Sequence, residues 1–207
     1  MKNKIKVLIA DDHSVVRMGL VALFDSKADI QVVGEARDGE EAVRAAEACK
    51  PDVIIMDLMM PKLNGAEATK AIRERCPGAK VLILTTFGTS DDISRALSVG
   101  ASGAILKSAD NAELVEAVRT VAAGESAVSR DISRLIREDP PVQELSPRQQ
   151  EILGSVTRGL TNREIAKVFD ISPESVKSHI TTIFAKIGAK TRSEAVTIAL
   201  RKQLLKM

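Results

Sequence analysis

The sequence contains no tryptophan or tyrosine, only four phenylalanines and only two cysteines in 207 residues. Proteins that bind single-stranded nucleic acid usually stack bases on aromatic side chains, so the composition argues against that class. Cys49 and Cys76 show neither pairing logic nor metal-ligand spacing, which predicts a reducing cytoplasm. No apolar run approaches the roughly 20 residues of a membrane span, and the first apolar run is too short for a signal peptide.

Charge is distributed unevenly along the chain, although the formal net charge is only +2. Residues 1–141 hold 19 basic and 22 acidic side chains, whereas residues 142–207 hold 11 and 6. An acidic front and a basic tail predict two modules, the second suited to a polyanion. Because aromatic residues are scarce, duplex nucleic acid is the better candidate for that polyanion.

Short apolar runs alternate with segments of helical spacing in the first module. We expect five strands, at Val7–Ala10, Ile30–Gly34, Val53–Met56, Val81–Leu84 and Ala104–Leu106. Strands that alternate with helices predict a parallel sheet covered on both faces. Five such units in about 120 residues fit one doubly wound α/β domain.

Polar residues follow four of these runs. Asp11 and Asp12 follow the first, Asp57 the third, Thr85 the fourth and Lys107 the fifth. Taken alone, an aspartate such as Asp57 is more often a helix N-cap or a turn residue. However, right-handed crossovers bring all these strand ends to one edge of the sheet. Three clustered carboxylates repel one another unless a cation neutralises them, and oxygen ligands suit Mg²⁺, with Lys107 placed for an incoming anion.

The motifs Asp11-Asp12, Asp57-Leu58-Met59-Met60-Pro61, Thr85 and Gly103-Ala104-Ile105-Leu106-Lys107 resemble the receiver domain of two-component response regulators, over residues 1 to about 122. The resemblance implies a flavodoxin-like fold and phosphorylation of Asp57 by a sensor histidine kinase. It also implies Mg²⁺ bound by Asp12, Asp57 and the backbone carbonyl of Met59, with Asp11 joining through water. Thr85 and Lys107 would bind the phosphoryl oxygens.

Two positions bear on how phosphorylation is transmitted. The family usually has an aromatic residue three positions before the lysine, where this sequence has Ala104. Either this difference is harmless, or the coupling beyond Thr85 is altered. In the loop that follows Thr85, Gly88 is the expected hinge.

The segment 124–143 is expected to link a receiver domain, 1–123, to a second domain, 144–207. It is rich in glycine, serine and proline, and Pro140-Pro141 predicts an extended spacer. Within it, Ile132, Leu135 and Ile136 have the spacing of one or two amphipathic helical turns, which the prolines would end.

The second domain is predicted to contain four short helices. Capping boxes begin at Ser146, Thr161 and Thr191, and Ser172 is a cap followed by proline. Only Asp170-Ile171 separates the helices that begin at Thr161 and Ser172, a helix-turn-helix spacing.

The helix after Ser172 carries a single apolar stripe, formed by Val176, Ile180, Ile183, Phe184 and Ile187. Its other face has mostly small polar side chains, which suit either a solvated surface or a major groove. Nearby cations favour phosphate contact; they are Arg163, Lys167, Lys186, Lys190 and Arg192.

Residues 145–203 resemble the LuxR-type helix-turn-helix, from Leu145-Ser146-Pro147-Arg148 through Leu160–Ala166 to Val176-Lys177-Ser178-His179. With the receiver, the whole chain resembles the NarL/FixJ family. The resemblance implies that Lys177, Ser178 and Thr181 face the bases of double-stranded promoter DNA. It also implies that the last helix, Ser193–Lys202, pairs two copies. The sequence position of His13 predicts a residue of the first helix and not a catalyst.

The leading hypothesis is a transcription factor that is not an enzyme, has no membrane contact, and binds DNA as a homodimer under the control of phosphorylation. A Mg²⁺-dependent phosphatase or phosphotransferase using Asp57 as nucleophile is the first rival, but Met59 stands where its general acid belongs. The second rival is a constitutive DNA binder whose receiver no longer switches, and Ala104 favours it.

Overall fold

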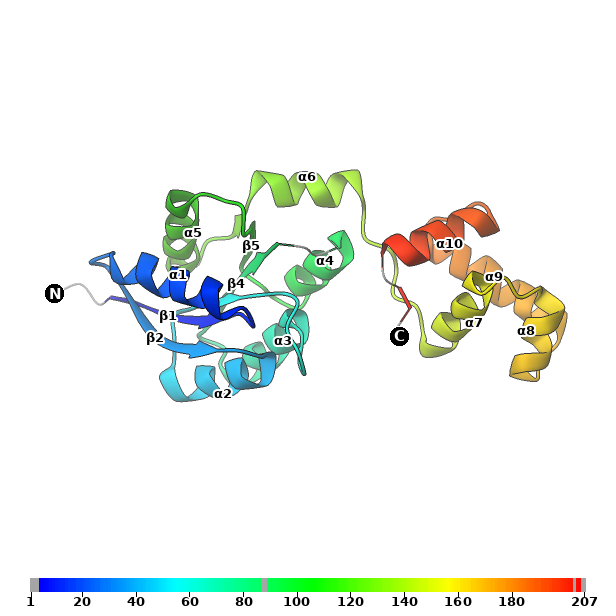
Figure 1. Ribbon diagram of the computed structural model, residues 1–207, viewed down its shortest axis with the longest axis horizontal. Helices are drawn as coiled ribbons and strands as arrows, with labels where there is room; N and C mark the ends of the chain where they lie inside the picture. Colours follow the sequence, from blue (N-terminus) through cyan, green and yellow to red (C-terminus); the bar gives the residue numbers. More distant parts are fainter. Residues whose placement is uncertain (1–3, 87–88, 203, 206–207) are drawn as a thin grey trace. The chain divides into compact units, whose positions relative to one another are not determined.

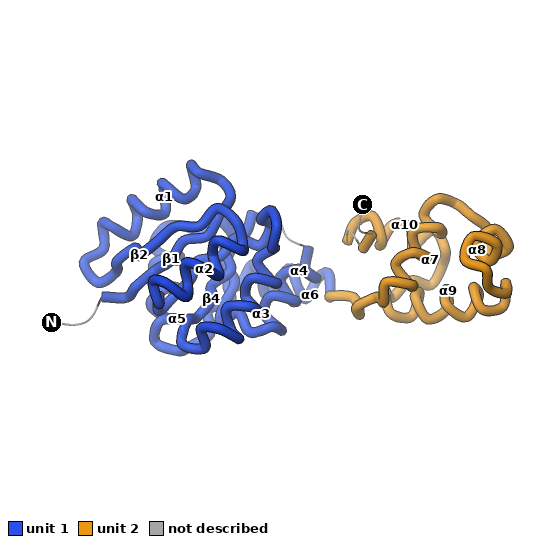
Figure 2. The backbone as a smooth tube through the Cα atoms, turned by 90° about the horizontal axis from the view of Figure 1, so that it is seen from below, with its two compact units in different colours: residues 1–140 blue, residues 141–207 orange. Residues whose placement is uncertain are grey.

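A computed structural model describes residues 4–86, 89–202 and 204–205 of the chain (Figure 1). The chain divides into two compact units, residues 1–140 and 141–207 (Figure 2). Among the described residues, no helix combines the length and the apolar character needed to span a bilayer.

The described part of unit 1 is built on one sheet of six parallel strands in the order β2-β1-β3-β4-β5-β6 (Figure 1). The strands are β1 Ile5–Ala10, β2 Ile30–Ala36, β3 Val53–Met56, β4 Lys80–Thr85, β5 Gly103–Leu106 and β6 Ala127–Val128. The order of the first five is that of flavodoxin-like folds. All five were predicted to within two residues at each end, but the short sixth strand was not.

Helices cover both faces of this sheet. They are α1 Ser14–Asp25, α2 Gly39–Cys49, α3 Gly65–Arg75, α4 Ser90–Ser98, α5 Asn111–Ala123 and α6 Arg130–Glu138. Successive residues of β3 point to opposite faces, so Ile54 packs with Ile72 of α3, while Ile55 packs with Phe24 of α1 and Val118 of α5. Burial on both faces explains why β3 is a continuous apolar run.

The segment 124–143, predicted to be a linker with one or two amphipathic helical turns, contains β6 and α6. Val128 pairs with Ala104 of β5, and the Ser129 N–H donates to the Ala104 carbonyl oxygen at 3.0 Å. Ile132 is completely buried in the cluster that contains Ala104, and Leu135 packs against that cluster. A side chain at Gly103 would place Cβ 2.3 Å from the Ala127 carbonyl oxygen, so glycine permits this close approach. The apolar stripe expected at Ile132, Leu135 and Ile136 lies on α6 and is buried because this helix docks on the sheet.

The described part of unit 2 forms four helices, as predicted: α7 Pro147–Thr157, α8 Asn162–Phe169, α9 Pro173–Ile187 and α10 Arg192–Arg201. Ser146 and Thr161 form complete capping boxes. The box predicted at Thr191 is only half formed, because the Glu194 carboxylate accepts from the Lys190 N–H (2.7 Å) one residue earlier. The apolar stripe of α9 contributes Val176, Ile183 and Ile187 to the core of this unit.

Candidate functional site

Three charged side chains meet at the carboxyl edge of the sheet in unit 1. Asp11 follows β1, Asp57 follows β3 and Lys107 follows β5. The Lys107 Nζ lies 2.8 Å from Asp57 Oδ2 and 2.5 Å from Asp11 Oδ2. Both aspartates are buried: the exposed fraction is 2% for Asp11 and 4% for Asp57. The structure therefore brings together residues that the strand ends predicted to converge.

Backbone hydrogen bonds fix the two aspartates in this position. The Asp57 N–H donates to the Ala10 carbonyl oxygen at 2.8 Å, and the Asp11 N–H donates to the Ala36 carbonyl oxygen at 3.1 Å. These bonds extend the sheet by one residue, so each carboxylate leaves from a rigid backbone. Asp57 Oδ1 also accepts the Leu58 N–H at 2.7 Å, which leaves Oδ2 facing Lys107.

Gly65 supports the site in a way that the sequence analysis did not predict. A Cβ at Gly65 would lie 2.2 Å from the Asp57 carbonyl oxygen, far inside van der Waals contact. The first turn of α3 therefore packs directly on the backbone of Asp57. The Gly65 N–H also donates to the Leu58 carbonyl oxygen at 2.9 Å.

Burial and charge shift the pKa values of the central pair. Burial raises the pKa of the Asp57 carboxyl, and the hydrogen bond from Lys107 opposes this rise without cancelling it. Burial alone would lower the pKa of Lys107, but the hydrogen bonds to Asp11 and Asp57 outweigh it, so this pKa is raised. Lys107 is therefore a permanent cation beside carboxylates in a poorly solvated pocket.

Asp12 and His13 complete a cluster of ligand-bearing side chains. One such atom from each of Asp11, Asp12, His13 and Asp57 lies within 4.8 Å of all the others. The His13 Nδ1 is 2.7 Å from Asp12 Oδ1 and 3.3 Å from Asp11 Oδ1. Three carboxylates facing one lysine leave an excess of negative charge, so the donor set fits a hard divalent cation.

The remaining predicted site residues border this cluster. Thr85 is the last residue of β4 and is buried, and its carbonyl oxygen accepts the Lys107 N–H at 2.8 Å. Met59 follows Asp57 by two residues and is 52% exposed. Gly88, the expected hinge, lies outside the described residues.

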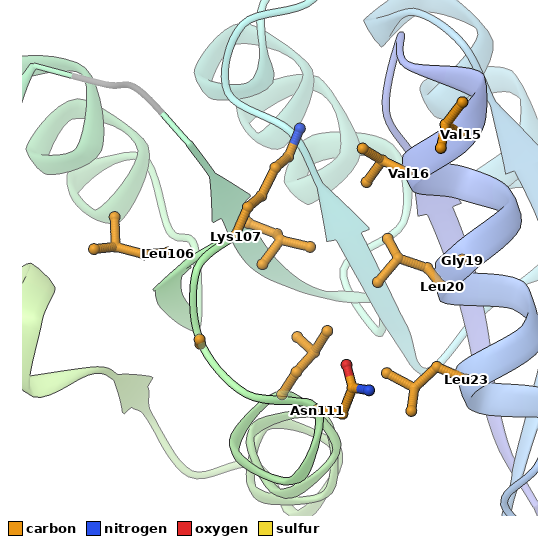
Figure 3. A pocket seen from close by; sticks show the side chains of 11 residues that line it. Val15, Val16, Gly19, Leu20, Leu23, Leu106, Lys107 and Asn111 are labelled. Atoms are coloured by element: carbon orange, nitrogen blue, oxygen red, sulfur yellow. The ribbon is translucent and has the colours of Figure 1, made fainter.

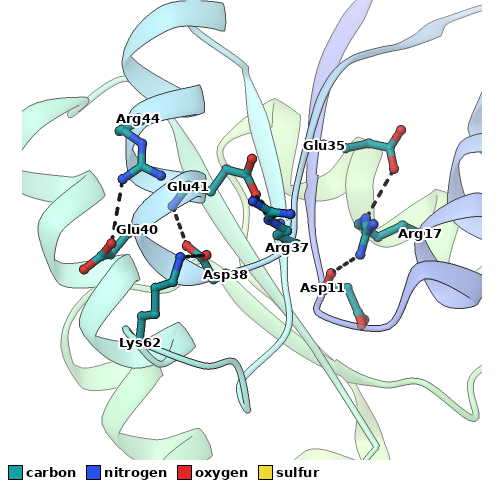
Figure 4. Close-up of polar contacts among 9 residues, drawn as sticks. All are labelled: Asp11, Arg17, Glu35, Arg37, Asp38, Glu40, Glu41, Arg44 and Lys62. Carbon is teal, nitrogen blue, oxygen red and sulfur yellow. Dashed lines mark hydrogen bonds and ion pairs between the residues drawn. The ribbon is translucent and has the colours of Figure 1, made fainter.

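Two ion-pair groups brace the surrounding loops (Figure 4). Arg17 of α1 donates to the Asp11 carbonyl oxygen at 2.7 Å and to Glu35 Oε2 at 3.3 Å, which ties the loop after β1 to β2. Asp38 accepts from Lys62 Nζ at 2.5 Å, which anchors the loop after Asp57 to the start of α2. Neither brace was predictable from the sequence pattern.

An apolar cavity of about 340 Å³ lies beside the site between α1 and α5 (Figure 3). Val16, Leu20 and Leu23 of α1 line one wall. Figure 3 shows the Lys107 side chain beside Val16, with its ammonium directed away from Leu23. Next to this cavity, Val15 and Met18 are exposed at 74% and 63%. The side of the site formed by α1 and α5 is therefore largely apolar.

In unit 2, α9 has the exposed polar face that the sequence predicted. Lys177, Ser178 and Thr181 are exposed, while Val176 and Ile183 on the opposite face are fully buried. The Thr181 hydroxyl donates to the Lys177 carbonyl oxygen at 3.0 Å. This face of α9 therefore carries polar groups that the core of the unit does not use.

The predicted cations divide into two groups. Arg163 and Lys190 are exposed, as phosphate contact requires. Lys186 instead donates to the Glu144 carbonyl oxygen at 2.8 Å and to Gln149 Oε1 at 3.0 Å. The Arg192 guanidinium donates to the Leu160 carbonyl oxygen. Lys186 and Arg192 thus connect segments within unit 2.

Comparisons with known families match both units. Residues 7–119 match the response regulator receiver domain, and residues 143–199 match the bacterial regulatory proteins of the luxR family. The chain therefore belongs to the response regulators that combine a receiver domain with a LuxR-type DNA-binding domain.

Individual relatives agree over nearly the full length. The transcriptional regulatory protein LiaR of Bacillus subtilis is 38% identical, covering 97% of this chain and 99% of LiaR. The response regulator protein VraR of Staphylococcus aureus is 36% identical, with the same coverage of 97% and 99%.

Solved structures give the same result. The response regulator ChrA of a heme-sensing two-component system has a TM-score of 0.59 at 37% identity, covering 98% of this chain and 100% of ChrA. A structure of RcsB dimers bound to DNA has a TM-score of 0.69 at 26% identity, covering 97% and 99%. The predicted family and fold class are confirmed, as is the prediction of a regulator in place of an enzyme, since the relatives are transcriptional regulators.

Proposed function

We propose that a partner sensor histidine kinase phosphorylates this response regulator on Asp57 and that phosphorylation switches its binding to promoter DNA. The observation that carries the proposal is the buried Asp57 carboxylate, 2.8 Å from Lys107 Nζ and beside two further carboxylates. The two family matches support this function, because a response regulator receiver domain is joined to a domain of the bacterial regulatory proteins of the luxR family.

The proposed reaction uses Asp57 as a carboxylate nucleophile. One of its oxygens bonds to the phosphorus, while the bond from phosphorus to the kinase's histidine nitrogen breaks and its electron pair stays on the imidazole. Lys107 then shifts its ammonium from the bare carboxylate to the new phosphoryl oxygens, with which it forms charge-assisted hydrogen bonds. Thr85, adjacent to Lys107 in space, supplies a hydroxyl to the same oxygens.

The proposed cation is Mg²⁺, held by Asp12, Asp57 and the Met59 carbonyl oxygen, with Asp11 acting through water. When bound, it neutralises charge on the transferring phosphoryl group. Asp11 and Asp57 are both buried, which keeps the negative charges of this site close together. Closely spaced, buried carboxylates favour the binding of a small divalent cation.

We propose that α6 carries the signal beyond Thr85. The helix α4 follows the loop after Thr85, and Ser90 at its start donates to Asp139 Oδ2, just beyond α6, at 3.2 Å. Ala104, at the position where the receiver family usually has an aromatic residue, packs in the same buried cluster as Ile132 of α6. A displacement of Thr85 toward the phosphoryl group is therefore transmitted to α4 and, through the hydrogen bond between Ser90 and Asp139, to α6.

We propose that α9 enters the major groove of promoter DNA, with Lys177, Ser178 and Thr181 facing base edges. The exposed cations Arg163 and Lys190 contact phosphates on either side. The exposed polar face of α9 and the DNA-bound dimers of RcsB support this arrangement. Two copies pair through the last helix, residues 193–202, and read half-sites about one helical turn apart.

Phosphorylation is tested by incubating the full chain with acetyl phosphate and Mg²⁺ and locating the modified residue by mass spectrometry. The expected result is one phosphoryl group on Asp57, formed only with a divalent cation. Asp57→Asn should stay unmodified, and Asp52→Asn, which alters an exposed aspartate before β3, should react like the wild type. Modification of Asp57→Asn at the wild-type rate would refute the proposal.

A further inference from the structure

His13 lies inside the acidic cluster, although its sequence position predicts only a residue at the start of a helix. We propose that its Nδ1 is a ligand of the divalent cation, so that this site binds transition-metal ions in preference to Mg²⁺. The inference rests on the proposed cation site and adds a nitrogen donor to it. The predicted ligands were all oxygen atoms.

The position of the imidazole fits coordination. In an octahedral site with bonds of about 2.1 Å, neighbouring ligand atoms lie about 3.0 Å apart. The His13 Nδ1 is 2.7 Å from Asp12 Oδ1, close to that separation. A carboxylate oxygen of Asp57 lies within 4.8 Å of the ligand atoms of His13 and Asp12, so an ion bound to the nitrogen is also close to two of the proposed carboxylate ligands.

The backbone holds His13 in this place. Its N–H donates to Asp11 Oδ1 at 2.9 Å, so the residue is tied to the buried carboxylate before it. His13 is the N-cap residue of α1 but its side chain makes no capping hydrogen bond. The imidazole is therefore not needed to begin the helix, and its side chain is 68% exposed on the solvent side of the cluster.

Nitrogen coordination has a chemical consequence. Mg²⁺ prefers oxygen ligands and keeps several waters, so an imidazole adds little to its binding. Mn²⁺ and Co²⁺ accept imidazole, and affinity for nitrogen-containing sites rises from Mn²⁺ to Co²⁺. His13 therefore sets which ion occupies the site at a given ion concentration. The competing role is a hydrogen bond from Nδ1–H to Asp12, which would position that carboxylate without ligating the ion.

Pulsed electron paramagnetic resonance of bound Mn²⁺ distinguishes the two roles, because a directly coordinated imidazole nitrogen couples to the electron spin. The wild-type full chain should show this coupling, and His13→Ala should lose it. The matched control is His179→Ala, which removes the other of the two histidines and lies on α9 in unit 2. Wild-type protein that binds Mn²⁺ without nitrogen coupling, or coupling that persists in His13→Ala, would overturn the inference.

Calorimetry with Co²⁺ and Mg²⁺ adds a second readout. His13→Ala should weaken Co²⁺ binding by roughly tenfold or more and leave the Mg²⁺ affinity nearly unchanged. An equal loss for both ions would mean that His13 only positions Asp12, and would also overturn the inference. The variant Asp57→Asn separates failure of the His13 inference from failure of the proposed function. If the wild type and Asp57→Asn bind Mg²⁺ equally, the proposed cation site itself is refuted.

Discussion

Replacing Ile132 by alanine should release α6 from the receiver unit while leaving the central sheet intact. Ile132 is completely buried, whereas its neighbours Leu135 and Ile136 are only partly buried. Truncating a buried isoleucine to alanine costs about 2–5 kcal/mol. A helix of nine residues does not form alone in water, so this loss falls on the docking of α6.

The expected effect is large enough to measure by hydrogen exchange. At 1.4 kcal/mol per tenfold, the population in which α6 is undocked should rise on the order of 30- to 4,000-fold. Amides of β6 and α6 should exchange faster by up to that factor, because β6 is the last strand of the sheet. Amides of β3, at the centre, should exchange at wild-type rates.

The matched control is Arg134→Ala, an exposed position on the same helix whose side chain pairs with Glu138. Exposed pairs of this type contribute about 0.3–0.5 kcal/mol, so exchange should change by roughly twofold. If α6 carries the signal, Ile132→Ala should also shrink the difference in DNA affinity between the phosphorylated and unphosphorylated protein. Equal exchange of α6 in the wild type and in Ile132→Ala would refute the reasoning about docking.

Three further substitutions test other parts of the account. Asp38→Ala removes the side chain that caps α2 and should lower the free energy of unfolding by about 1–2 kcal/mol. The Lys62 hydrogen bond holds the pKa of Asp38 below its usual value, so this stabilisation is complete at neutral pH and lost as pH falls through that lowered pKa; the deficit measured by urea unfolding should therefore shrink in acid. Gly65→Ala forces its Cβ against the Asp57 carbonyl oxygen and should slow phosphorylation by acetyl phosphate about 100-fold; an unchanged rate would contradict this. Lys177→Ala should weaken duplex binding and reduce the slope of log affinity against log salt by about 1, whereas an unchanged slope would count against Lys177 as a phosphate or base contact.

Five strands of the central sheet were predictable because each is a short apolar run, and four of these runs end at residues with distinct chemistry. Asp57 ends one such run and Lys107 another, 50 residues later. Chain topology alone brings them to one edge, since parallel strands with right-handed crossovers all end on the same side. The resemblance then assigned a role to each residue.

The sequence was less informative wherever tertiary contacts decide the outcome. The apolar stripe of α6 is short and lies among polar residues and prolines, so its pattern did not reveal that Ile132 is buried. Positive charge alone did not separate Lys190, which is exposed, from Lys186 and Arg192, which donate to carbonyl oxygens within unit 2.

Some determinants of the site are distances, which composition and spacing do not encode. Gly65 is required by a close approach to the backbone of Asp57. The proposed role of His13 depends on where its Nδ1 lies relative to Asp12. A histidine after two aspartates and a glycine at the start of a helix each have common alternative explanations, and only the folded chain distinguishes them.

Binding of duplex DNA with and without phosphorylation tests the central claim most directly. A duplex selected by the phosphorylated protein from a randomised library serves as the probe, and fluorescence anisotropy gives its Kd. With acetyl phosphate and Mg²⁺ the wild type should bind this duplex more tightly, while Asp57→Asn should bind equally with and without the donor. Equal Kd values for the wild type in both conditions, with Asp57 shown to be phosphorylated, would contradict the account and favour a constitutive DNA binder.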